Sequence, residues 1–176
     1  ACPAPTALLT IEKGNNMAKE AKTNAMRMLE RAKVAYTSHE YPHEEGQAVD
    51  GANVARLTGQ DPARVFKTLV TKAASGAYYV FDIPVAENLD LKKAAKAVGE
   101  KSVAMLPQKE LLPLTGYVHG GCSPVGMKKQ FPTVFHETAP LYGTICVSAG
   151  KIGHQVECDP NALIALLRAK TADVIV

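Results

Sequence analysis

The strongest constraint on the fold is a pair of strand-like runs, RVFKTLVTKA (64–73) and AYYVFDIPV (77–85), separated by a link that contains Ser75 and Gly76. Both runs are rich in β-branched and aromatic residues, and a short glycine-containing link between such runs is typical of a β-hairpin. The strands of a hairpin are antiparallel, whereas a doubly wound sheet joins parallel strands through helices. The hairpin therefore favours a mixed sheet over a doubly wound one.

Helix-like and strand-like segments are interleaved irregularly along the rest of the chain. Helical spacing of apolar residues and capping residues mark the helices, and β-branched runs mark the strands. Helices are expected at 23–33, 50–57, 89–98, 108–112 and 161–170, and further strands at 34–41, 102–106, 132–137, 143–150 and 151–158. At 176 residues we expect a single α/β domain, with a mixed, curved or barrel-like β-sheet surrounded by helices.

The composition is that of a globular protein, with 47% apolar and 21% charged residues. No run reaches the ~18 consecutive apolar residues of a membrane span. The formal net charge of +3 permits a local basic patch but falls short of the strongly basic composition of a dedicated nucleic-acid binder. The cysteines at positions 2, 122, 146 and 158 form no C-x-x-C pair, so zinc-ribbon spacing is absent. We therefore expect a soluble, cytoplasmic protein with reduced thiols and no membrane association.

Residues 1–16 precede Met17 and a lysine-rich segment. They lack the basic start and the long apolar block of a signal peptide. We interpret them as an upstream or cloning-derived leader without ordered structure, and expect the domain to occupy residues 17–176.

The segment His39–His43 spells H-E-x-x-H, the signature of zinc proteases. That signature binds zinc only on a helix, where the two histidines lie one turn apart on the same face. Pro42 lies inside the motif and disfavours a helix, and the residue before a proline, Tyr41, is pushed toward extended backbone. We therefore expect a strand here, and neither a metal nor another cofactor.

Lys67 is a charged residue in the segment VFKTLV (65–70), whose other residues on both strand faces, apart from Thr68, are apolar. Lysine is rarely buried without a partner, because removing water from the ammonium group costs free energy. Lys67 therefore either extends to solvent at a strand end or lines a pocket.

The segment GGCSPVG (120–126) combines three glycines with a proline, a thiol and a hydroxyl. It has neither the G-x-G-x-x-G nor the Walker pattern of nucleotide-binding loops. Its backbone amides are suited to an oxyanion or a carbonyl oxygen, and the positive segment MKK (127–129) follows it. Cys122 is either a small packing residue, which we favour, or a nucleophile with His119 as its base.

Four segments in the same order resemble the bacterial YbaK-type Cys-tRNA(Pro) deacylases, free-standing relatives of the editing domain of prolyl-tRNA synthetase. The segments are FKTLV (66–70), LDLKKAAKAVG (89–99), TGYVHGGCSPVGMKK (115–129) and VSAGKIGHQVECDP (147–160). The similarity runs from about Thr23 to the C-terminus. Cys122 and Ala149 depart from the family pattern, which commonly has an aliphatic residue and a glycine there.

The resemblance implies an aminoacyl-tRNA hydrolase with a mixed, barrel-like α/β fold. Lys67 corresponds to the central active-site lysine of the family. The substrate-binding positions carried over from the family are Tyr41, Thr68, Gly120, Gly121, Cys122, Ser123, Pro124, Ser148 and Gly150. The implied partner is the acceptor end of a mischarged tRNA(Pro), with prolyl-tRNA synthetase as a further candidate partner.

For a cysteinyl ester, the family suggests that the thiol of the substrate attacks its own carbonyl carbon, so that neither a metal nor an enzyme nucleophile is required. The residues agree with such a role, because they contain no convincing catalytic triad or metal cluster. Two alternatives stay open: a deacylase for another misacylated tRNA, such as Ala-tRNA(Pro), and a noncatalytic tRNA- or synthetase-binding protein.

Overall fold

The computed structural model describes residues 22–176, so the expected leader at 1–16 lies outside the described residues. The helices are α2 (Asn24–Arg31), α3 (Gly51–Thr58), α4 (Leu91–Val98), α5 (Gln108–Thr115) and α6 (Pro160–Leu167), with 3-10 turns η1 (Pro62–Arg64) and η2 (Ala139–Leu141). The strands are β1 (Tyr36–Glu40), β2 (Phe66–Ala73), β3 (Tyr78–Pro84), β4 (Val103–Met105), β5 (Thr133–His136), β6 (Ile145–Ser148), β7 (His154–Cys158) and β8 (Lys170–Ala172).

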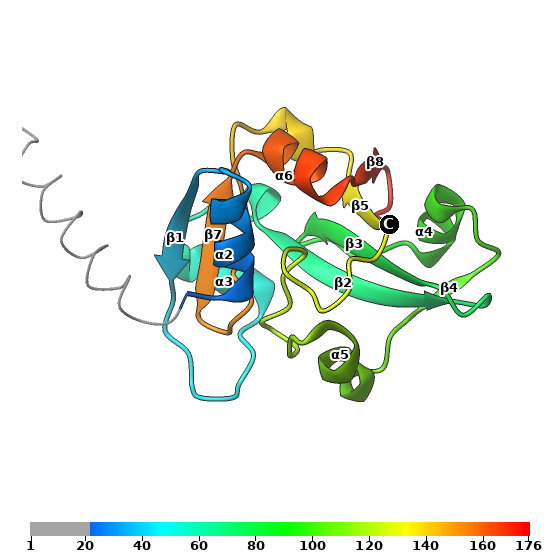
Figure 1. The fold of residues 1–176 in the computed structure, drawn as a ribbon, viewed down its shortest axis with the longest axis horizontal. Coiled ribbons are helices and arrows are strands. Elements are labelled where there is room, and N and C mark those ends of the chain that lie inside the picture. The colour runs from blue at the N-terminus through cyan, green and yellow to red at the C-terminus, as the bar shows by residue number, and fades with distance from the viewer. Residues whose placement is uncertain (1–21) are drawn as a thin grey trace, which may run out of the picture.

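The strands form two sheets, with helices around them (Figure 1). The smaller sheet has the order β1-β7-β6 and is antiparallel throughout. The larger sheet has the order β4-β2-β3-β5-β8, in which β3–β5 and β5–β8 are parallel pairs and the others are antiparallel. An isolated bridge between Val65 and Cys146 links the two sheets beside the start of β2. The expected hairpin and the mixed single-domain α/β fold are confirmed, and of the expected alternatives of a curved or a barrel-like sheet, a closed barrel is not formed.

The ends of the helices follow the capping residues of the sequence. The side chains of Thr23, Asp90 and Asp159 accept hydrogen bonds from backbone N–H groups in the first turns of α2, α4 and α6. Asp50 also precedes a helix, α3, but its carboxylate makes no such bond. Its charge therefore remains available to a neighbouring group.

Two elements differ from expectation. Helix α5 continues past Pro113 to Thr115, because the Thr115 hydroxyl donates to the Leu111 carbonyl over 2.8 Å and the Gly116 amide closes the last turn on Leu112. Strand β8 lies in a short, mostly polar stretch that no periodicity marks as a strand. It forms by parallel pairing with β5, which is a tertiary contact.

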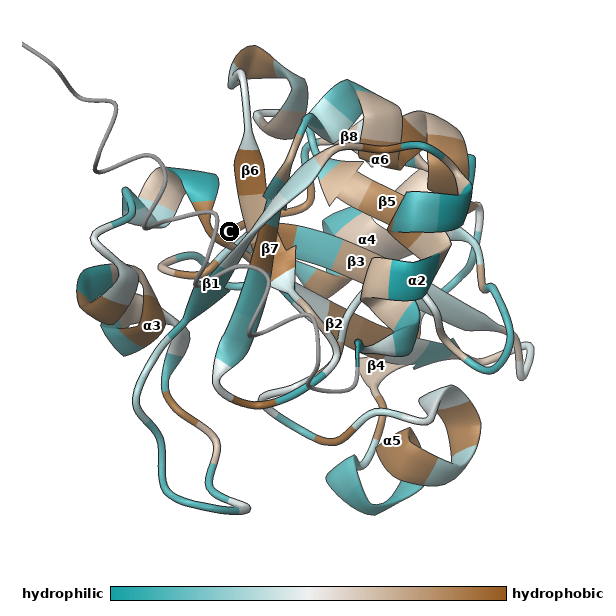
Figure 2. Cartoon of the chain, turned by 60° about the vertical axis from the view of Figure 1, so that its left-hand side comes forward, coloured by the Kyte–Doolittle hydropathy of each residue, from teal (hydrophilic) through white to brown (hydrophobic). Residues whose placement is uncertain are grey.

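The apolar core consists of several clusters, and each sheet packs against its own cluster. One cluster packs α2 and α6 on the smaller sheet, and a second packs α4 on the hairpin. In Figure 2 the strand β6 and much of α6 are coloured hydrophobic, whereas the edge strand β1 is largely hydrophilic. A third cluster holds the segment that follows α5 against β2 and β3; its buried members are Val70, Val80, Leu106, Tyr117, Cys122, Met127 and Phe131. No helix among residues 22–176 is long and apolar enough to cross a membrane.

Candidate active site

Strand β2 carries two of the expected site residues, Lys67 and Thr68. In the hairpin register, Lys67 lies opposite Ile83 and Thr68 lies opposite Asp82. Because side chains alternate along a strand, the lysine and the threonine leave β2 on opposite faces. Thr68 donates a 2.6 Å hydrogen bond to Asp82 Oδ1, on the face that the segment after α5 covers.

The Lys67 side chain is half-buried. Desolvation lowers the pKa of Lys67, and the negative charges of Asp50 and Glu87 oppose that shift. Within residues 22–176 its ammonium group makes no hydrogen bond and no ion pair under 4 Å. A partly desolvated cation whose donors are unused is suited to binding an anionic group of a ligand.

The segment 120–126, here called the pocket loop, is largely buried, and several of its polar groups bond internally. The Gly121 amide donates to the Val118 carbonyl over 3.0 Å, and the Val125 amide donates to Ser123 Oγ over 3.2 Å. The Ser123 side chain is fully buried, so its hydroxyl supports the loop. In contrast, the amides of Gly120, Cys122, Ser123 and Gly126 make no hydrogen bond within the described chain, and of these residues Cys122 and Ser123 are buried. Unpaired buried amides are uncommon, and an amide without a protein acceptor is suited to donating to the carbonyl oxygen of a ligand.

The pocket loop lies close to two other segments, and its glycines permit the approach. A Cβ on Gly120, where φ is +86°, would lie 2.5 Å from Ala48 Cβ. A Cβ on Gly121 would lie 3.0 Å from the backbone nitrogen of Ile152. The loop therefore fits between two segments. One is the stretch from the end of β1 to the start of α3, residues 41–50, here called the segment before α3, and the other is the turn 149–153, here called the β6–β7 turn.

The β6–β7 turn brings further expected residues to the pocket loop. Ser148 Oγ accepts a 3.1 Å hydrogen bond from the Gly150 amide. A Cβ on Gly150 would lie 2.7 Å from the Tyr117 ring, whose hydroxyl donates over 2.7 Å to the Val125 carbonyl of the loop. The backbone amide of Tyr41 donates to the Gly153 carbonyl over 2.9 Å. The structure thus places Tyr41, Ser148 and Gly150 in one contiguous region with the loop.

Lys67 connects to this region through the segment before α3. Ala48 approaches Gly120, and two residues later the carboxylate of Asp50 acts on the Lys67 ammonium group. Sequence reasoning missed the contributions of Ala48 and Asp50, because nothing in the exposed segment that holds them marks it as part of a site. It also missed Asp82, although a charge inside the apolar strand YYVFDIP is the same signal that identified Lys67.

Cys122 lacks the surroundings of a nucleophile. The side chain is 8% exposed, and burial, with a smaller effect from Asp82, raises the pKa of its thiol to about 12. The reactive form of a cysteine is the thiolate, which such a pKa suppresses at neutral pH. The favoured interpretation of Cys122 as a packing residue therefore agrees with its environment.

We expect Cys122→Ser to keep most of the catalytic activity, because the thiol is neither ionised nor exposed. In the native protein, peptide mapping after brief iodoacetamide treatment should find Cys122 unmodified. Complete loss of activity in a folded Cys122→Ser protein would restore the nucleophile hypothesis.

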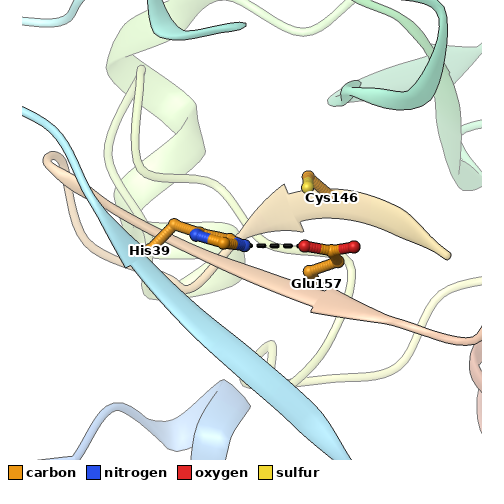
Figure 3. A group of neighbouring side chains, drawn as sticks. All are labelled: His39, Cys146 and Glu157. Atoms are coloured by element: carbon orange, nitrogen blue, oxygen red, sulfur yellow. Dashed lines mark hydrogen bonds and ion pairs between the residues drawn. The ribbon is translucent and has the colours of Figure 1, made fainter. Parts of the chain in front are cut away.

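The H-E-x-x-H motif does not form a zinc site, because His39 lies on β1 rather than on a helix. Figure 3 shows His39 pointing across the sheet to Glu157 of β7, with a 2.7 Å hydrogen bond between them, beside Cys146 of β6. The other carboxylate oxygen of Glu157 accepts from Arg64 over 3.1 Å and from the Thr144 hydroxyl. Both oxygens are therefore used by protein donors, and a guanidinium already provides positive charge there.

Glu157→Gln should destabilise the fold by about 1–3 kcal/mol, because the amide cannot serve several donors as a charged acceptor does. Hydrogen bonds from Thr144 and His39 lower the pKa of Glu157. A lowered carboxylate pKa contributes stability above the unfolded pKa and loses it as the pH falls. The difference in unfolding free energy between the variant and the wild type should therefore shrink below about pH 5. Urea unfolding at pH 7 and pH 4 measures this, and equal differences at both pH values would contradict it.

The fold and the site together define a single-domain α/β protein in which the segment before α3 approaches a loop with unpaired amides through Ala48 and acts on a half-buried cation, Lys67, through Asp50. A cation and unpaired amides are suited to an acyl group attached to a phosphate-bearing molecule. Residues 45–166 match the family model of the aminoacyl-tRNA editing domain. This match covers more than half of the chain. The chain therefore belongs to the aminoacyl-tRNA editing domain family, as its sequence resemblance implied.

Two individual proteins give the same assignment. EbsC of Enterococcus faecalis, named as a candidate Cys-tRNA(Pro)/Cys-tRNA(Cys) deacylase, is 47% identical over 155 residues, which are 88% of this chain and 94% of EbsC. The crystal structure of a candidate trans-editing enzyme for prolyl-tRNA synthetase has a TM-score of 0.74 and 25% identity, covering 87% of this chain and 95% of that one. The crystallised hypothetical protein APE2540, with a TM-score of 0.77, 21% identity and coverage of 87% and 99%, shares the fold.

Proposed function

We propose that this chain is a trans-editing deacylase that hydrolyses the ester between cysteine and the terminal ribose of tRNA(Pro), and that residues 17–176 form its working domain. The observation that carries the proposal is the pair of unpaired amides at Cys122 and Ser123, in a loop that the segment before α3 connects to Lys67. Family membership and the names of EbsC and of the trans-editing structural neighbour support the substrate class.

Each group has a distinct role in the proposed reaction. The Cys122 and Ser123 amides hold the carbonyl oxygen of the ester, where negative charge develops. Lys67 binds a phosphate of the terminal nucleotide and so fixes the ester in place. Thr68, Tyr41, Ser148 and Gly150 shape the space for the aminoacyl group.

The nucleophile is the thiol of the cysteinyl group itself. Its sulfur forms a bond to the carbonyl carbon while the bond from that carbon to the ribose oxygen breaks, and the thiol proton ends on the ribose oxygen. Water then attacks the carbonyl carbon of the resulting four-membered thiolactone, the bond from that carbon to sulfur breaks, and free cysteine with its thiol restored is released. The protein supplies position and charge stabilisation, which agrees with the uncharged, buried Cys122 thiol. The reaction requires no metal.

The experiment is deacylation of Cys-tRNA(Pro), Ala-tRNA(Pro) and Pro-tRNA(Pro) in parallel, in buffer that contains EDTA. We expect fast loss of cysteine and slow loss of alanine and proline, because only cysteine carries the internal nucleophile. Faster loss of alanine would assign the chain to the alanyl substrate and remove the thiol mechanism. Loss of activity in EDTA would contradict the metal-free reaction.

The proposed partners are the acceptor end of tRNA(Pro) and prolyl-tRNA synthetase. A comparison of Cys-tRNA(Pro) with Cys-tRNA(Cys), each with and without the synthetase, shows where the tRNA is recognised. Preference for tRNA(Pro) only when the synthetase is present would assign recognition to the partner, whereas preference without it would assign recognition to this chain.

A further inference from the structure

Asp82 is a fully buried carboxylic acid that the proposed reaction does not use. It lies in β3, directly opposite Thr68 of β2, and its side chain is 0% exposed. Its Oδ1 atom accepts the 2.6 Å hydrogen bond from the Thr68 hydroxyl. Its Oδ2 atom has no hydrogen-bond partner among residues 22–176. A buried carboxyl group with one unsatisfied oxygen costs free energy, so its presence calls for a functional explanation.

The surroundings of Asp82 connect the hairpin to the pocket loop. Cys122 lies near enough for the Asp82 charge to act on its thiol. Tyr117, which belongs to the same buried cluster as Cys122, donates a hydrogen bond to the Val125 carbonyl of the loop. Asp82 is therefore a buried residue that bonds to Thr68, a residue of the proposed site, and lies close to Cys122 of the pocket loop.

We propose that Asp82 is a positioning residue of the deacylase site, which acts through its hydrogen bond to Thr68. The inference rests on the proposed function. A threonine hydroxyl has one proton, so while that proton is donated to Asp82, only the oxygen lone pairs of Thr68 face the site. Thr68 is then an acceptor for a donor of the aminoacyl group, either its α-ammonium group or its thiol.

The burial of Asp82 also determines its charge. Desolvation raises the pKa of Asp82 to about 8, with a smaller opposing effect from the Thr68 hydrogen bond. The titratable groups on this side are Cys122 and, beyond it, Tyr117, and the pKa of each is raised to about 12, so both are uncharged near neutrality. The folded protein thus holds a proton on Asp82 that the unfolded chain releases between about pH 4 and pH 8, and this residue lowers stability as the pH rises through that window.

The test uses Asp82→Val, Thr68→Val and the double variant. Valine suits a strand and removes the hydrogen bond from either side. Loss of a hydrogen bond of typical strength predicts a rate on Cys-tRNA(Pro) about 5- to 10-fold lower in each single variant. The double variant should be no slower than Thr68→Val alone, because Asp82 acts through Thr68. Asp82→Val should be at least as stable as the wild type at pH 8, since it removes a buried charge.

Asp82→Asn is the matched control, because it keeps an acceptor for Thr68 and carries no charge at any pH. Its rate should stay within about threefold of the wild type, and its melting temperature should exceed that of the wild type increasingly from pH 5 to pH 8.

A wild-type rate in Asp82→Val, or an undiminished effect of Asp82→Val in the Thr68→Val background, would overturn the inference. A wild type that deacylates none of the esters would instead overturn the proposed function. The unfolding free energies of the wild type, Asp82→Val, Thr68→Val and the double variant would still measure the coupling between Asp82 and Thr68.

Discussion

Lys67→Ala should lower the rate of Cys-tRNA(Pro) deacylation by about 10²- to 10³-fold and leave the protein folded. The magnitude is that of removing one preorganised electrostatic group from an active site. The fold should tolerate the change because desolvation already disfavours the Lys67 charge, so the alanine removes a cost from the folded state. Single-turnover kinetics at saturating protein measure the effect on the chemical step.

Lys72→Ala is the matched control for this variant. Lys72 lies on the same strand but is exposed, with its ammonium group 5.7 Å from the centre of the Tyr78 ring. It should deacylate at the wild-type rate. Lys67→Arg keeps the positive charge in a longer, planar group and should recover only part of the activity. Equal activity of Lys67→Ala and the wild type would remove Lys67 from the site.

Gly150→Ala should destabilise the protein and disturb the pocket loop together. The residue has φ +94°, a conformation that side chains avoid, and the new Cβ would lie 2.7 Å from the Tyr117 ring. Backbone strain and overpacking cost about 1–3 kcal/mol each. Their sum, about 2–6 kcal/mol, predicts a melting temperature roughly 4–24 °C lower. Because Tyr117 holds the Val125 carbonyl, displacement of its ring also shifts the loop, and a shift of about 1 Å can cost on the order of 10²-fold in rate.

Gly99→Ala separates these two contributions. Gly99 ends α4 with φ +73°, and a Cβ there would meet nothing within 4 Å. It should cost about 1–2 kcal/mol from the left-handed backbone alone, with full activity retained. If calorimetry shows the same loss of stability in both glycine variants, or if Gly150→Ala is fully active, the contact with Tyr117 does not position the loop.

The sequence predicted those parts of the fold that local patterns determine. The hairpin around Gly76, the helix capped by Asp90 and the false zinc motif interrupted by Pro42 all depend on residues close together in the chain. Strand β8 and the pairing of His39 with Glu157 do not, because they join segments far apart and no periodicity encodes them.

In the candidate site, too, the residues marked by local sequence were predicted and the contacts made by tertiary packing were not. Lys67 stood out as a charge in an apolar strand, and the pocket loop stood out by its glycines. Ser123 was expected to bind substrate, but its hydroxyl is buried and bonds to the Val125 amide, so any contact it makes must come from its backbone. The contacts of Gly120 with Ala48 and of Gly150 with Tyr117 depend on tertiary packing, which one sequence does not reveal.

The most direct test of the central claim is the time course of Cys-tRNA(Pro) deacylation by the wild type and by Lys67→Ala, after subtraction of the uncatalysed rate. The proposed site predicts rapid release of cysteine by the wild type and a rate at least about 10²-fold lower for the variant. Binding of the charged tRNA without any release of cysteine by the wild type would contradict it, and would leave a noncatalytic tRNA-binding protein as the better description.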